Sequence, residues 1–355
     1  MPTTLLTNSY LFVETESMSN VVHLNTSKGR SSRSFAEIRA LVAEDFQSVD
    51  SLISGLLRSK VSTISDIGQH IVEGGGKRLR PLIVLLTVKG CNYQGEDHIR
   101  LATLIEFLHT ATLLHDDVVD ESDRRRGRAT ANAIWGNKPS VLVGDFLYSR
   151  AFQLMVEINR MDLMSIISDA TNTIAEGEVM QLENIGNVHL SETDYMEIIR
   201  CKSALLFEAA AETAAVLSNS TPALMKSLKS FGLNLGLAYQ IIDDILDYIG
   251  DSDILGKNVG DDLSEGKLTL PLIYAMQHGG VADASRIKTA IENRDPSDLA
   301  NIIETVKATG ALERAKQKAR MLSNAAIDAL RHDPPIGTYR NALIQLTQSA
   351  LERIH

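Results

Sequence analysis

The stretch Asp116-Asp117-Val118-Val119-Asp120 closes the long apolar segment LATLIEFLHTATLLHDD (101–117) and decides how the chain is interpreted. On a helix, Asp116 and Asp120 lie one turn apart and share a face. Three carboxylates within one turn repel one another, and nothing about folding favours them, so we expect a cation to offset the repulsion. All-oxygen ligands suit a hard cation, first of all Mg²⁺, which combines one or two carboxylates with waters and with phosphate oxygens of a substrate.

An acidic motif with the same spacing occurs again 127 residues further along the chain. Asp243, Asp244 and Asp247 lie at the end of the apolar segment GLNLGLAYQIIDDILDY (232–248). With ordinary residue frequencies, one such motif arises by chance in a chain of this length at odds of about 7%, but two arise at about 0.3%. A single motif would be interpreted as a solvated helix end, whereas a pair inside apolar helices indicates a function.

Two basic clusters accompany the acidic motifs. GGGKRLRP (74–81) opens a predicted helix, where glycines, helix-start N–H groups and basic side chains suit a phosphate. It is not a P-loop, because Lys77 is followed by Arg78, and a solvated basic turn explains it equally well. RRRGR (124–128) follows the first acidic motif closely, as a metal-bridged diphosphate requires. The alternative for this second cluster is a surface group whose charges neutralise one another.

Helical periodicity dominates the chain from about residue 35 onward. Apolar residues recur at three- and four-residue spacing in FAEIRALVAEDFQSVDSLISGLL (35–57), and apolar/polar alternation between Asn-Gly or Asp-Gly turns is absent. The sequence therefore predicts an all-α fold without strands. Helices are expected at about 138–158, 161–183, 191–217, 222–250, 266–278, 283–292, 297–309, 311–331 and 337–353, with caps at Ser191 with Asp194, at Ser297 and at Asp333.

The domain organisation follows from the same pattern. A chain of 355 residues suggests about two domains, yet no linker composition and no repeat interrupts the helices. We therefore expect one large helical domain at 35–355, preceded by a mobile arm at 1–34 that is rich in Ser, Thr and Asn. Met18 is a second candidate for the true first residue, because nothing before it looks structural.

Composition excludes several classes of protein. The net charge of −10 argues against a nucleic-acid binder, which usually carries a basic balance. Two cysteines rule out a disulfide scaffold and a Cys-based zinc site. No segment is long and apolar enough to span a bilayer, and the N-terminal patch lacks the Lys/Arg start of a secretory signal. A cytoplasmic protein is the expectation.

At the level of whole motifs, the chain resembles the trans-prenyl diphosphate synthases, most closely bacterial members that make octaprenyl diphosphate for quinone side chains. The matching stretches are GGGKRLRP (74–81), EFLHTATLLHDDVVDESDRRRG (106–127), VLVGDFLYSRAF (141–152), AEGEVMQLEN (175–184), KSALLFEAAA (202–211), YQIIDDILDY (239–248) and GKNVGDDLSEGKLTLPL (256–272). One position departs from the family pattern, since Lys202 is followed by Ser203 where Thr is usual. The resemblance implies a bundle with a deep central cavity, acidic motifs facing each other across its mouth, and a homodimer.

The resemblance also implies roles for single residues. Asp116, Asp120, Asp243 and Asp247 are expected to bind several Mg²⁺ ions, with Asp117 and Asp244 in catalytic support. An allylic prenyl diphosphate, expected to be farnesyl diphosphate, would be held by Arg125, Lys202, Ser203, Gln240, Lys257 and Lys267, with Lys202 also catalytic. Isopentenyl diphosphate would be held by Lys77, Arg80, His109 and Arg126. The apolar product implies transient contact with a membrane on release.

Small residues near the first acidic motif favour a long product. Ala111 and Thr112 stand where short-chain members of the family carry bulky aromatics, and Met155 is the candidate for the floor of the tunnel. Ordinary core packing explains these three residues equally well. We therefore expect a C40 product, with a C15 or C20 product as the alternative.

Three other classes of protein compete with this interpretation. A terpene cyclase also ionises a prenyl diphosphate, but it would need neither GGGKRLRP nor a second intact acidic motif. A non-catalytic prenyltransferase subunit tends to lose Asp or Arg from the motifs, and this chain keeps them. A di-iron carboxylate bundle requires Glu-x-x-His pairs, which are missing.

Overall fold

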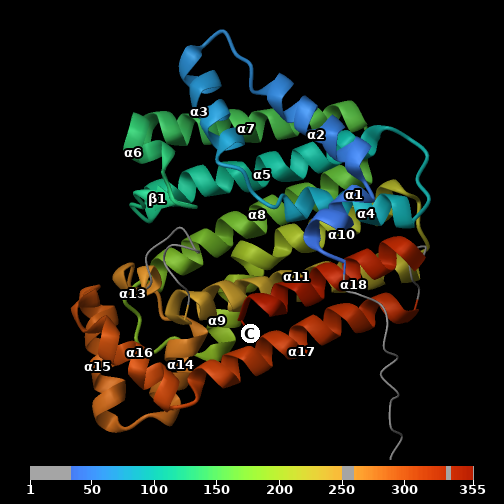
Figure 1. The fold of residues 1–355 in the computed structure, drawn as a ribbon. Helices are drawn as coiled ribbons and strands as arrows, with labels where there is room; N and C mark the ends of the chain where they lie inside the picture. The colour runs from blue at the N-terminus through green and yellow to red at the C-terminus, as the bar shows by residue number, and fades with distance from the viewer. Residues whose placement is uncertain (1–32, 250–259, 333–336, 355) are drawn as a thin grey trace, which may run out of the picture. The chain divides into compact units, whose positions relative to one another are not determined.

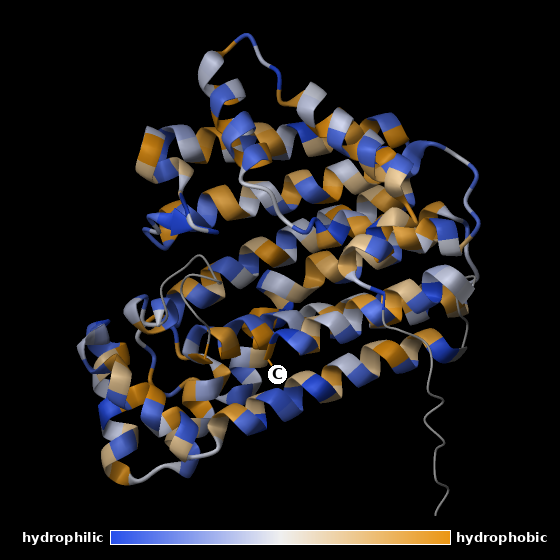
Figure 2. Cartoon of the chain, viewed as in Figure 1, coloured by the Kyte–Doolittle hydropathy of each residue, from blue (hydrophilic) through white to orange (hydrophobic). Residues whose placement is uncertain are grey.

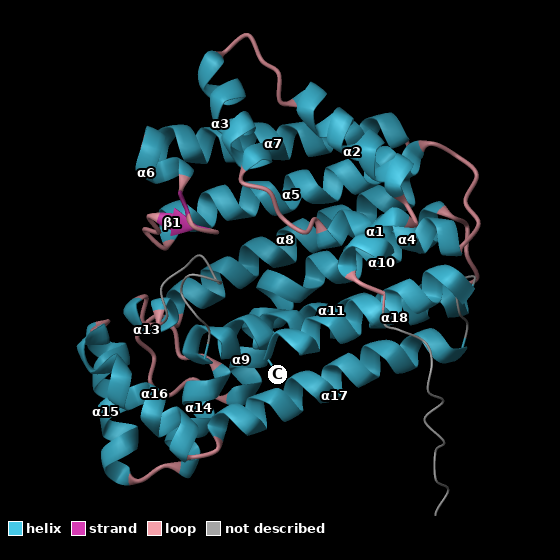
Figure 3. Cartoon of the chain, in the orientation of Figure 1, coloured by secondary structure: helices cyan, strands magenta, loops and turns pink. Residues whose placement is uncertain are grey.

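The structure is a computed structural model that describes residues 33–249, 260–332 and 337–354. Almost all of these residues are helical, as Figure 3 shows, which confirms the predicted all-α fold. Met18 and the other residues of 1–32 lie outside the described part of the chain, as do the Asp333 cap and Lys257. Among the described residues, no helix combines the length and the apolar composition that crossing a membrane would need.

The long helix α5 (Asp97–Val119) forms the centre of one half of the helical domain. It packs against α7, α4, α2 and α10, so apolar residues are buried around most of its circumference. This burial explains why the segment 101–117 is apolar nearly all round. Its neighbours in this half are α1 (Phe35–Ala40), α2 (Ala43–Leu56), α3 (Ser62–Glu73), α4 (Leu79–Gly90), α6 (Ala131–Trp135) and α7 (Asn137–Ile158).

The second long core helix is α11 (Pro222–Ile249), which carries the second acidic motif near its end. It packs against α10 (Leu205–Leu217) and α17 (Ala311–His332), and Figure 1 shows these helices running side by side. Hydrophobic and hydrophilic residues alternate along α17 (Figure 2), because only one side of this helix faces the core. The remaining elements of this half are α8 (Met161–Glu183), α9 (Glu192–Ile199), α13 (Asp261–Ser264), α14 (Leu270–His278), α15 (Val281–Asn293), the 3₁₀ turn η2 (Pro296–Asp298), α16 (Leu299–Ala308), α18 (Gly337–Leu351) and the 3₁₀ turn η3 (Glu352–Ile354).

Several predicted helix ends need correction. Ser34, predicted as part of a mobile arm, caps α1, because its hydroxyl accepts the Glu37 N–H and Glu37 accepts the N–H of Ser34. The cap predicted at Ser297 is wrong, since Asp295 caps the short turn η2 and α16 starts later. Residues 266–269 precede α14 instead of starting it. The cap at Ser191 with Asp194 is confirmed.

The expectation of no strands is also wrong at one place. The strands β1 (Arg124–Arg125) and β2 (Arg128–Ala129) form an antiparallel hairpin directly after the first acidic motif. Arg126 and Gly127 make its two-residue turn with φ of 52° and 76°, the left-handed values of a type I′ turn. The pattern escaped notice because each strand has two residues and the turn is Arg-Gly instead of Asn-Gly or Asp-Gly.

The helix predicted at 191–217 contains a wide turn that its sequence pattern does not reveal. Between α9 and α10, residues Arg200–Ala204 form the π-helical turn η1. The N–H of Leu205 bonds to the carbonyl of Arg200, five residues back instead of four. The turn carries Lys202 and Ser203, so it is part of the candidate site.

Candidate active site

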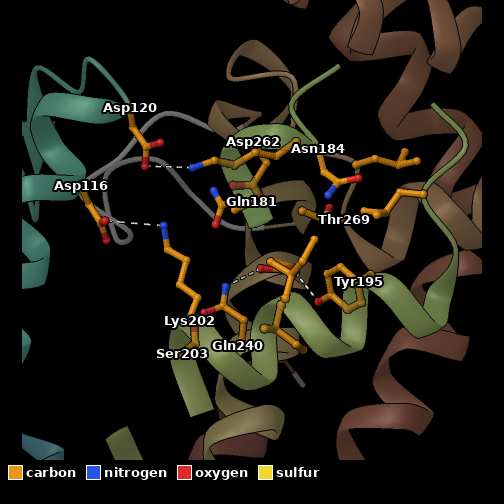
Figure 4. A pocket seen from close by; sticks show the side chains of 16 residues that line it. Asp116, Asp120, Gln181, Asn184, Tyr195, Lys202, Ser203, Gln240, Asp262 and Thr269 are labelled. Atoms are coloured by element: carbon orange, nitrogen blue, oxygen red, sulfur yellow. Dashed lines mark hydrogen bonds and ion pairs between the residues drawn. The ribbon is translucent and has the colours of Figure 1, made fainter. Parts of the chain in front are cut away.

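A cavity of about 150 Å³ lies where α5, α8, the helix α9–α10 and α11 meet. Figure 4 shows its polar side chains, which come from segments far apart in the sequence. Of the predicted site residues, the cavity brings together Asp116, Asp120, Lys202, Ser203, Gln240, Asp244 and Lys267. The two acidic motifs and the predicted allylic-diphosphate residues therefore meet, in part, at one cavity.

The first acidic motif faces this cavity in two ion pairs. Asp120 accepts a hydrogen bond of 2.9 Å from the ammonium of Lys267, and Asp116 lies 3.6 Å from the ammonium of Lys202. Only 17% of the Asp116 side chain and 13% of the Asp120 side chain are exposed. The two lysines thus supply positive charge to two of the three neighbouring carboxylates.

A further carboxylate holds Lys202 in place. Glu178 on α8 lies 2.6 Å from the Lys202 ammonium. Burial raises the pKa of Glu178 to about 7, although the Lys202 charge opposes the rise. Burial alone would lower the pKa of Lys202, but Asp116 and Glu178 outweigh that effect and raise it. Lys202 is therefore a firmly protonated ammonium at the edge of the cavity.

Lys267 is held in the same manner on the other side of the cavity. Its ammonium lies 2.6 Å from Glu265 as well as 2.9 Å from Asp120. Burial lowers the pKa of Lys267, but the two carboxylates more than compensate, and the net shift is upward. Both lysines of the cavity therefore keep their charge at neutral pH.

Asp117 points away from the cavity, toward the hairpin. It is buried and accepts a hydrogen bond of 2.8 Å from Arg125 on β1. Burial raises the pKa of Asp117, while Arg125 acts in the opposite direction. Asp117 therefore positions the hairpin, and Arg125, predicted to hold the allylic diphosphate, lines a neighbouring pocket instead of this cavity.

The second acidic motif has two buried carboxylates and one exposed carboxylate. Asp244 accepts hydrogen bonds from the Tyr195 hydroxyl at 2.5 Å and from Gln240 at 2.8 Å. Asp247 is buried and accepts the backbone N–H of Asp262 at 3.3 Å. Asp243, in contrast, is 50% exposed and lies outside the cavity lining.

The donor chemistry at the first motif fits a divalent cation. Asp116 and Asp120 offer carboxylate oxygens one turn apart, each beside an ammonium that a harder cation can replace. Within the described ranges, however, no three Asp, Glu, His or Cys side chains are close enough together to hold a metal ion. A metal site formed from these carboxylates would therefore have to be completed by substrate oxygens and waters, as Mg²⁺ prefers.

Two of the four predicted isopentenyl-diphosphate residues line a smaller pocket of about 60 Å³. His109 and Arg126 line it, and Arg80 is close enough to act electrostatically on both. Burial keeps the pKa of His109 well below its usual value, and the charges of Arg80 and Arg126 depress it further. Burial also lowers the pKa of Arg80 to about 10. His109 is therefore a neutral imidazole among guanidinium groups.

Lys77 lies apart from this pocket. Burial lowers the pKa of its ammonium, Arg353 lowers it further and Asp243 opposes both. Its role toward isopentenyl diphosphate stays a prediction.

The predicted chain-length residues lie in packed surroundings. Ala111 and Met155 are buried in the core where α5 meets α7, and neither lines any of the three pockets described here. The hydroxyl of Thr112 donates to the carbonyl of His109 at 2.8 Å. Their role in product length stays a prediction.

Sequence reasoning missed several residues of the cavity. Glu178, which holds Lys202, and the cavity residues Gln181 and Asn184 recur at three-residue spacing at the C-terminal end of α8, a polar stripe that could have identified them. Gln181 and Asn184 line the cavity, as does Tyr195. No sequence signal would have identified Arg353, whose partner Asp243 is 110 residues away.

Comparison with known proteins identifies the family. Residues 61–308 match the polyprenyl synthetase family. The octaprenyl diphosphate synthase of Escherichia coli K12 is 49% identical over 318 residues, which cover 89% of this chain and 98% of that protein. An all-trans-nonaprenyl-diphosphate synthase (geranyl-diphosphate specific) of Rhodobacter capsulatus is 47% identical over 319 residues, covering 90% of this chain and 98% of that protein.

The fold also resembles that of a solved polyprenyl synthase. A polyprenyl synthase from Caulobacter crescentus CB15, solved in complex with calcium and isoprenyl diphosphate, superimposes with a TM-score of 0.87. It is 42% identical, and the match covers 91% of this chain and 99% of that chain. The acidic motifs and the lysines that pair with them agree with this likeness in sequence and fold. The chain therefore belongs to the polyprenyl synthetase family.

Proposed function

We propose that the chain is an octaprenyl diphosphate synthase that extends an allylic prenyl diphosphate, such as farnesyl diphosphate, with isopentenyl diphosphate in a head-to-tail reaction that depends on Mg²⁺. The observation that carries the proposal is the pairing of Asp116 with Lys202 and of Asp120 with Lys267 at one cavity. Carboxylates and ammonium groups alternate there, as the binding of a metal-bridged diphosphate requires.

The cavity residues act on the allylic diphosphate. Lys202, Lys267, Ser203 and Gln240 hold its diphosphate group, and the bound Mg²⁺ would neutralise part of the charge of that leaving group. The allylic C–O bond breaks heterolytically, the electron pair leaves with the diphosphate, and the lysines stabilise the developing negative charge. Asp116 and Asp120 are the residues that would hold the metal, together with Asp243.

The smaller pocket, lined by His109 and Arg126, binds isopentenyl diphosphate. Arg80 and Arg126 bind the diphosphate of isopentenyl diphosphate, and neutral His109 donates a hydrogen bond without adding charge. The double bond of isopentenyl diphosphate attacks the allylic carbocation. The new cation then loses a proton to the released diphosphate. Holding the two substrates side by side supplies much of the rate.

Product length is the finer part of the proposal. The chain is almost equally similar to an octaprenyl and to a nonaprenyl diphosphate synthase. The test is chromatography of the products formed from farnesyl diphosphate, isopentenyl diphosphate and Mg²⁺. A dominant C40 product supports the proposal, C45 identifies a nonaprenyl enzyme, and C15 or C20 rules out a long-chain synthase.

We further propose that two chains form a homodimer. Leu142, Phe152 and Val156 of α7 are 66%, 47% and 67% exposed, and Ile134 of α6 is 48% exposed. Exposed apolar side chains of this kind mark interaction surfaces. Analytical ultracentrifugation should give twice the chain mass, and Phe152→Asp should shift the species toward the monomer.

The cellular setting completes the proposal. The reaction takes place in the cytoplasm, and the apolar product leaves through transient contact with a membrane. Vesicles of neutral phospholipid should therefore raise the steady-state turnover with farnesyl diphosphate, because product release limits the rate without them. Unchanged turnover with vesicles would contradict this part of the proposal.

A further inference from the structure

The π-helical turn Arg200–Ala204 changes the phase of a long helix at the place where the cavity is built. A regular helix rotates about 100° per residue, so one extra residue in a turn shifts the two flanking segments by about that angle. On the N-terminal side, Tyr195, Ile198 and Ile199 line the cavity. On the C-terminal side, α10 is buried almost throughout.

Lys202 and Ser203 lie within this turn, and both line the cavity. The turn lets two consecutive polar residues face the cavity while α10 keeps its packing in the core. Glu178 then holds the Lys202 ammonium at 2.6 Å. The direction of Lys202 therefore depends on the wide turn.

Two glycines from different helices pack closely against this turn. A methyl group at Gly177 of α8 would lie 2.7 Å from the backbone nitrogen of Lys202 and 2.7 Å from Cβ of Cys201. A methyl group at Gly236 of α11 would lie 2.6 Å from Cα and 2.9 Å from the carbonyl oxygen of Ala204. Real Cβ atoms do not approach other atoms this closely, and backbone atoms cannot turn aside as a flexible side chain can.

We infer that Gly177 and Gly236 are positioning residues, which hold the π turn between α8 and α11 and thereby direct Lys202 and Ser203 toward the allylic diphosphate. The inference rests on the proposed function and specifies which of the two substrates these glycines serve. The isopentenyl-diphosphate residues Arg80 and His109 belong to α4 and α5, outside the turn. A displaced turn should therefore weaken the allylic substrate selectively.

Gly232 provides a matched control on the same helix. A methyl group there would lie 2.5 Å from the carbonyl oxygen of Phe207 and 2.8 Å from Cα of Glu208, on α10 beyond the π turn. The steric conflict is as severe as at Gly236 but touches no cavity residue. Gly232→Ala therefore separates loss of helix packing from loss of the turn.

The experiment compares Gly177→Ala, Gly236→Ala and Gly232→Ala by steady-state kinetics, varying farnesyl diphosphate and isopentenyl diphosphate separately. We expect the first two variants to raise KM for farnesyl diphosphate at least tenfold while KM for isopentenyl diphosphate changes less than twofold. Gly232→Ala should lower the melting temperature by a similar amount and leave the KM for farnesyl diphosphate within twofold of the parent. Any effect of this variant on the KM for isopentenyl diphosphate is expected to arise through Phe207, whose ring centre lies 4.1 Å from the guanidinium of Arg80. Equal effects of all three variants on the farnesyl KM, or none, would overturn the inference.

A thiol measurement tests the turn without any turnover. Cys201 lies in the turn and is buried, and Cys91→Ser leaves it as the only thiol of the chain. In that background, Gly177→Ala and Gly236→Ala should raise the rate of alkylation of Cys201 by iodoacetamide at least fivefold, and Gly232→Ala should not. If Gly177→Ala fails to fold, Gly236→Ala carries both measurements.

Failure of the proposed function is recognised separately. If the parent chain does not elongate farnesyl diphosphate, titration calorimetry with inorganic diphosphate and Mg²⁺ replaces the kinetics. Weaker binding in the two turn variants but not in Gly232→Ala then supports the inference while the function fails. Unchanged binding in the turn variants overturns the inference.

Discussion

The guanidinium group of Arg353 lies 2.8 Å from Oδ1 of Asp243, although the two residues are 110 positions apart. Arg353 also lies over the ring of Tyr239, at 6.0 Å from its centre. The most exposed carboxylate of the second acidic motif is thus paired with a cation, as Asp116 and Asp120 are. A metal ion that binds Asp243 through Oδ1 would compete with the guanidinium for this oxygen.

Removing the Arg353 guanidinium should strengthen the binding of Mg²⁺ to Asp243. The Asp243–Arg353 pair is partly exposed, and such pairs contribute at most about 1 kcal/mol, which corresponds to about a fivefold change in affinity. Arg353→Ala is therefore expected to lower the Mg²⁺ concentration for half-maximal activity up to about fivefold. Arg331→Ala, which removes an exposed arginine on α17, is the control. A higher Mg²⁺ requirement in Arg353→Ala would show that Arg353 assists the site instead of competing for it.

Asp116 should be indispensable for turnover. Asp116→Ala is expected to reduce kcat by at least about a thousandfold, because the proposed metal ligand and the charge that it would organise are lost together. The fold should survive, since Lys202 keeps its ion pair with Glu178. Asp123→Ala removes an exposed carboxylate of the following loop and should retain activity. Full activity of Asp116→Ala would contradict the metal-centred mechanism.

Tyr195 should matter through Asp244. Its buried hydroxyl donates to the carboxylate at 2.5 Å, and burial together with Asp244 holds the pKa of Tyr195 well above its usual value. A hydrogen bond to a charged group is worth about 1.5–3 kcal/mol, so Tyr195→Phe should reduce kcat/KM about 10- to 100-fold. Tyr93→Phe, a partly buried tyrosine outside the cavity lining, is the matched control. Equal kcat/KM values of the two variants would show that Tyr195 does not contribute to the active site.

Product length should respond to the volume of residue 111. Ala111→Leu and Ala111→Tyr are expected to shorten the product stepwise, because larger side chains fill the space that the growing chain needs. Ala111 is fully buried, so overpacking should also lower the melting temperature. Chromatography of the products decides the matter, with the melting curve as the check on folding. An unchanged C40 product from a folded Ala111→Tyr variant would show that Ala111 does not line the tunnel.

Glu178 should make stability depend on pH in metal-free buffer. Its pKa rises from 4.5 to about 7 on folding, so between these pH values the folded state keeps a proton that the unfolded chain has released. This carboxyl group therefore lowers the free energy of unfolding as pH rises from 4.5 to 7. Relative to the parent, Glu178→Gln should become progressively more stable over that interval in urea unfolding. A constant difference between the two proteins would contradict the shifted pKa.

The sequence foretold most of the fold because helix periodicity is a local property. The segment of α5 was recognisable as a long apolar run and those of α8 and α11 from their apolar spacing, and both acidic motifs stood out by their repeated spacing. The hairpin at Arg124–Ala129 escaped because its strands are too short for any periodicity. The π turn escaped because no residue pattern distinguishes it from a regular helical turn.

Site residues that depend on tertiary contacts were the harder part. No motif in the sequence singles out Tyr195, and only the fold brings its hydroxyl to Asp244. The segment AEGEVMQLEN was recognised as a motif, but the sequence does not show why it contains Gly177. The structure shows that a larger side chain at Gly177 would collide with the backbone nitrogen of Lys202. Such contacts join residues with no fixed spacing, so a single sequence does not encode them in any local pattern.

The π turn also bears on how related chains are aligned. It is a helix with one residue more than the regular geometry needs, so a relative that replaces it with a regular turn differs by a deletion of a single residue between 200 and 204. An alignment that allows no gap inside a helix would then align Lys202 with a residue of the relative that is not its structural equivalent. In alignments of relatives, a one-residue gap at this place therefore indicates a changed wall of the cavity that Lys202 and Ser203 line.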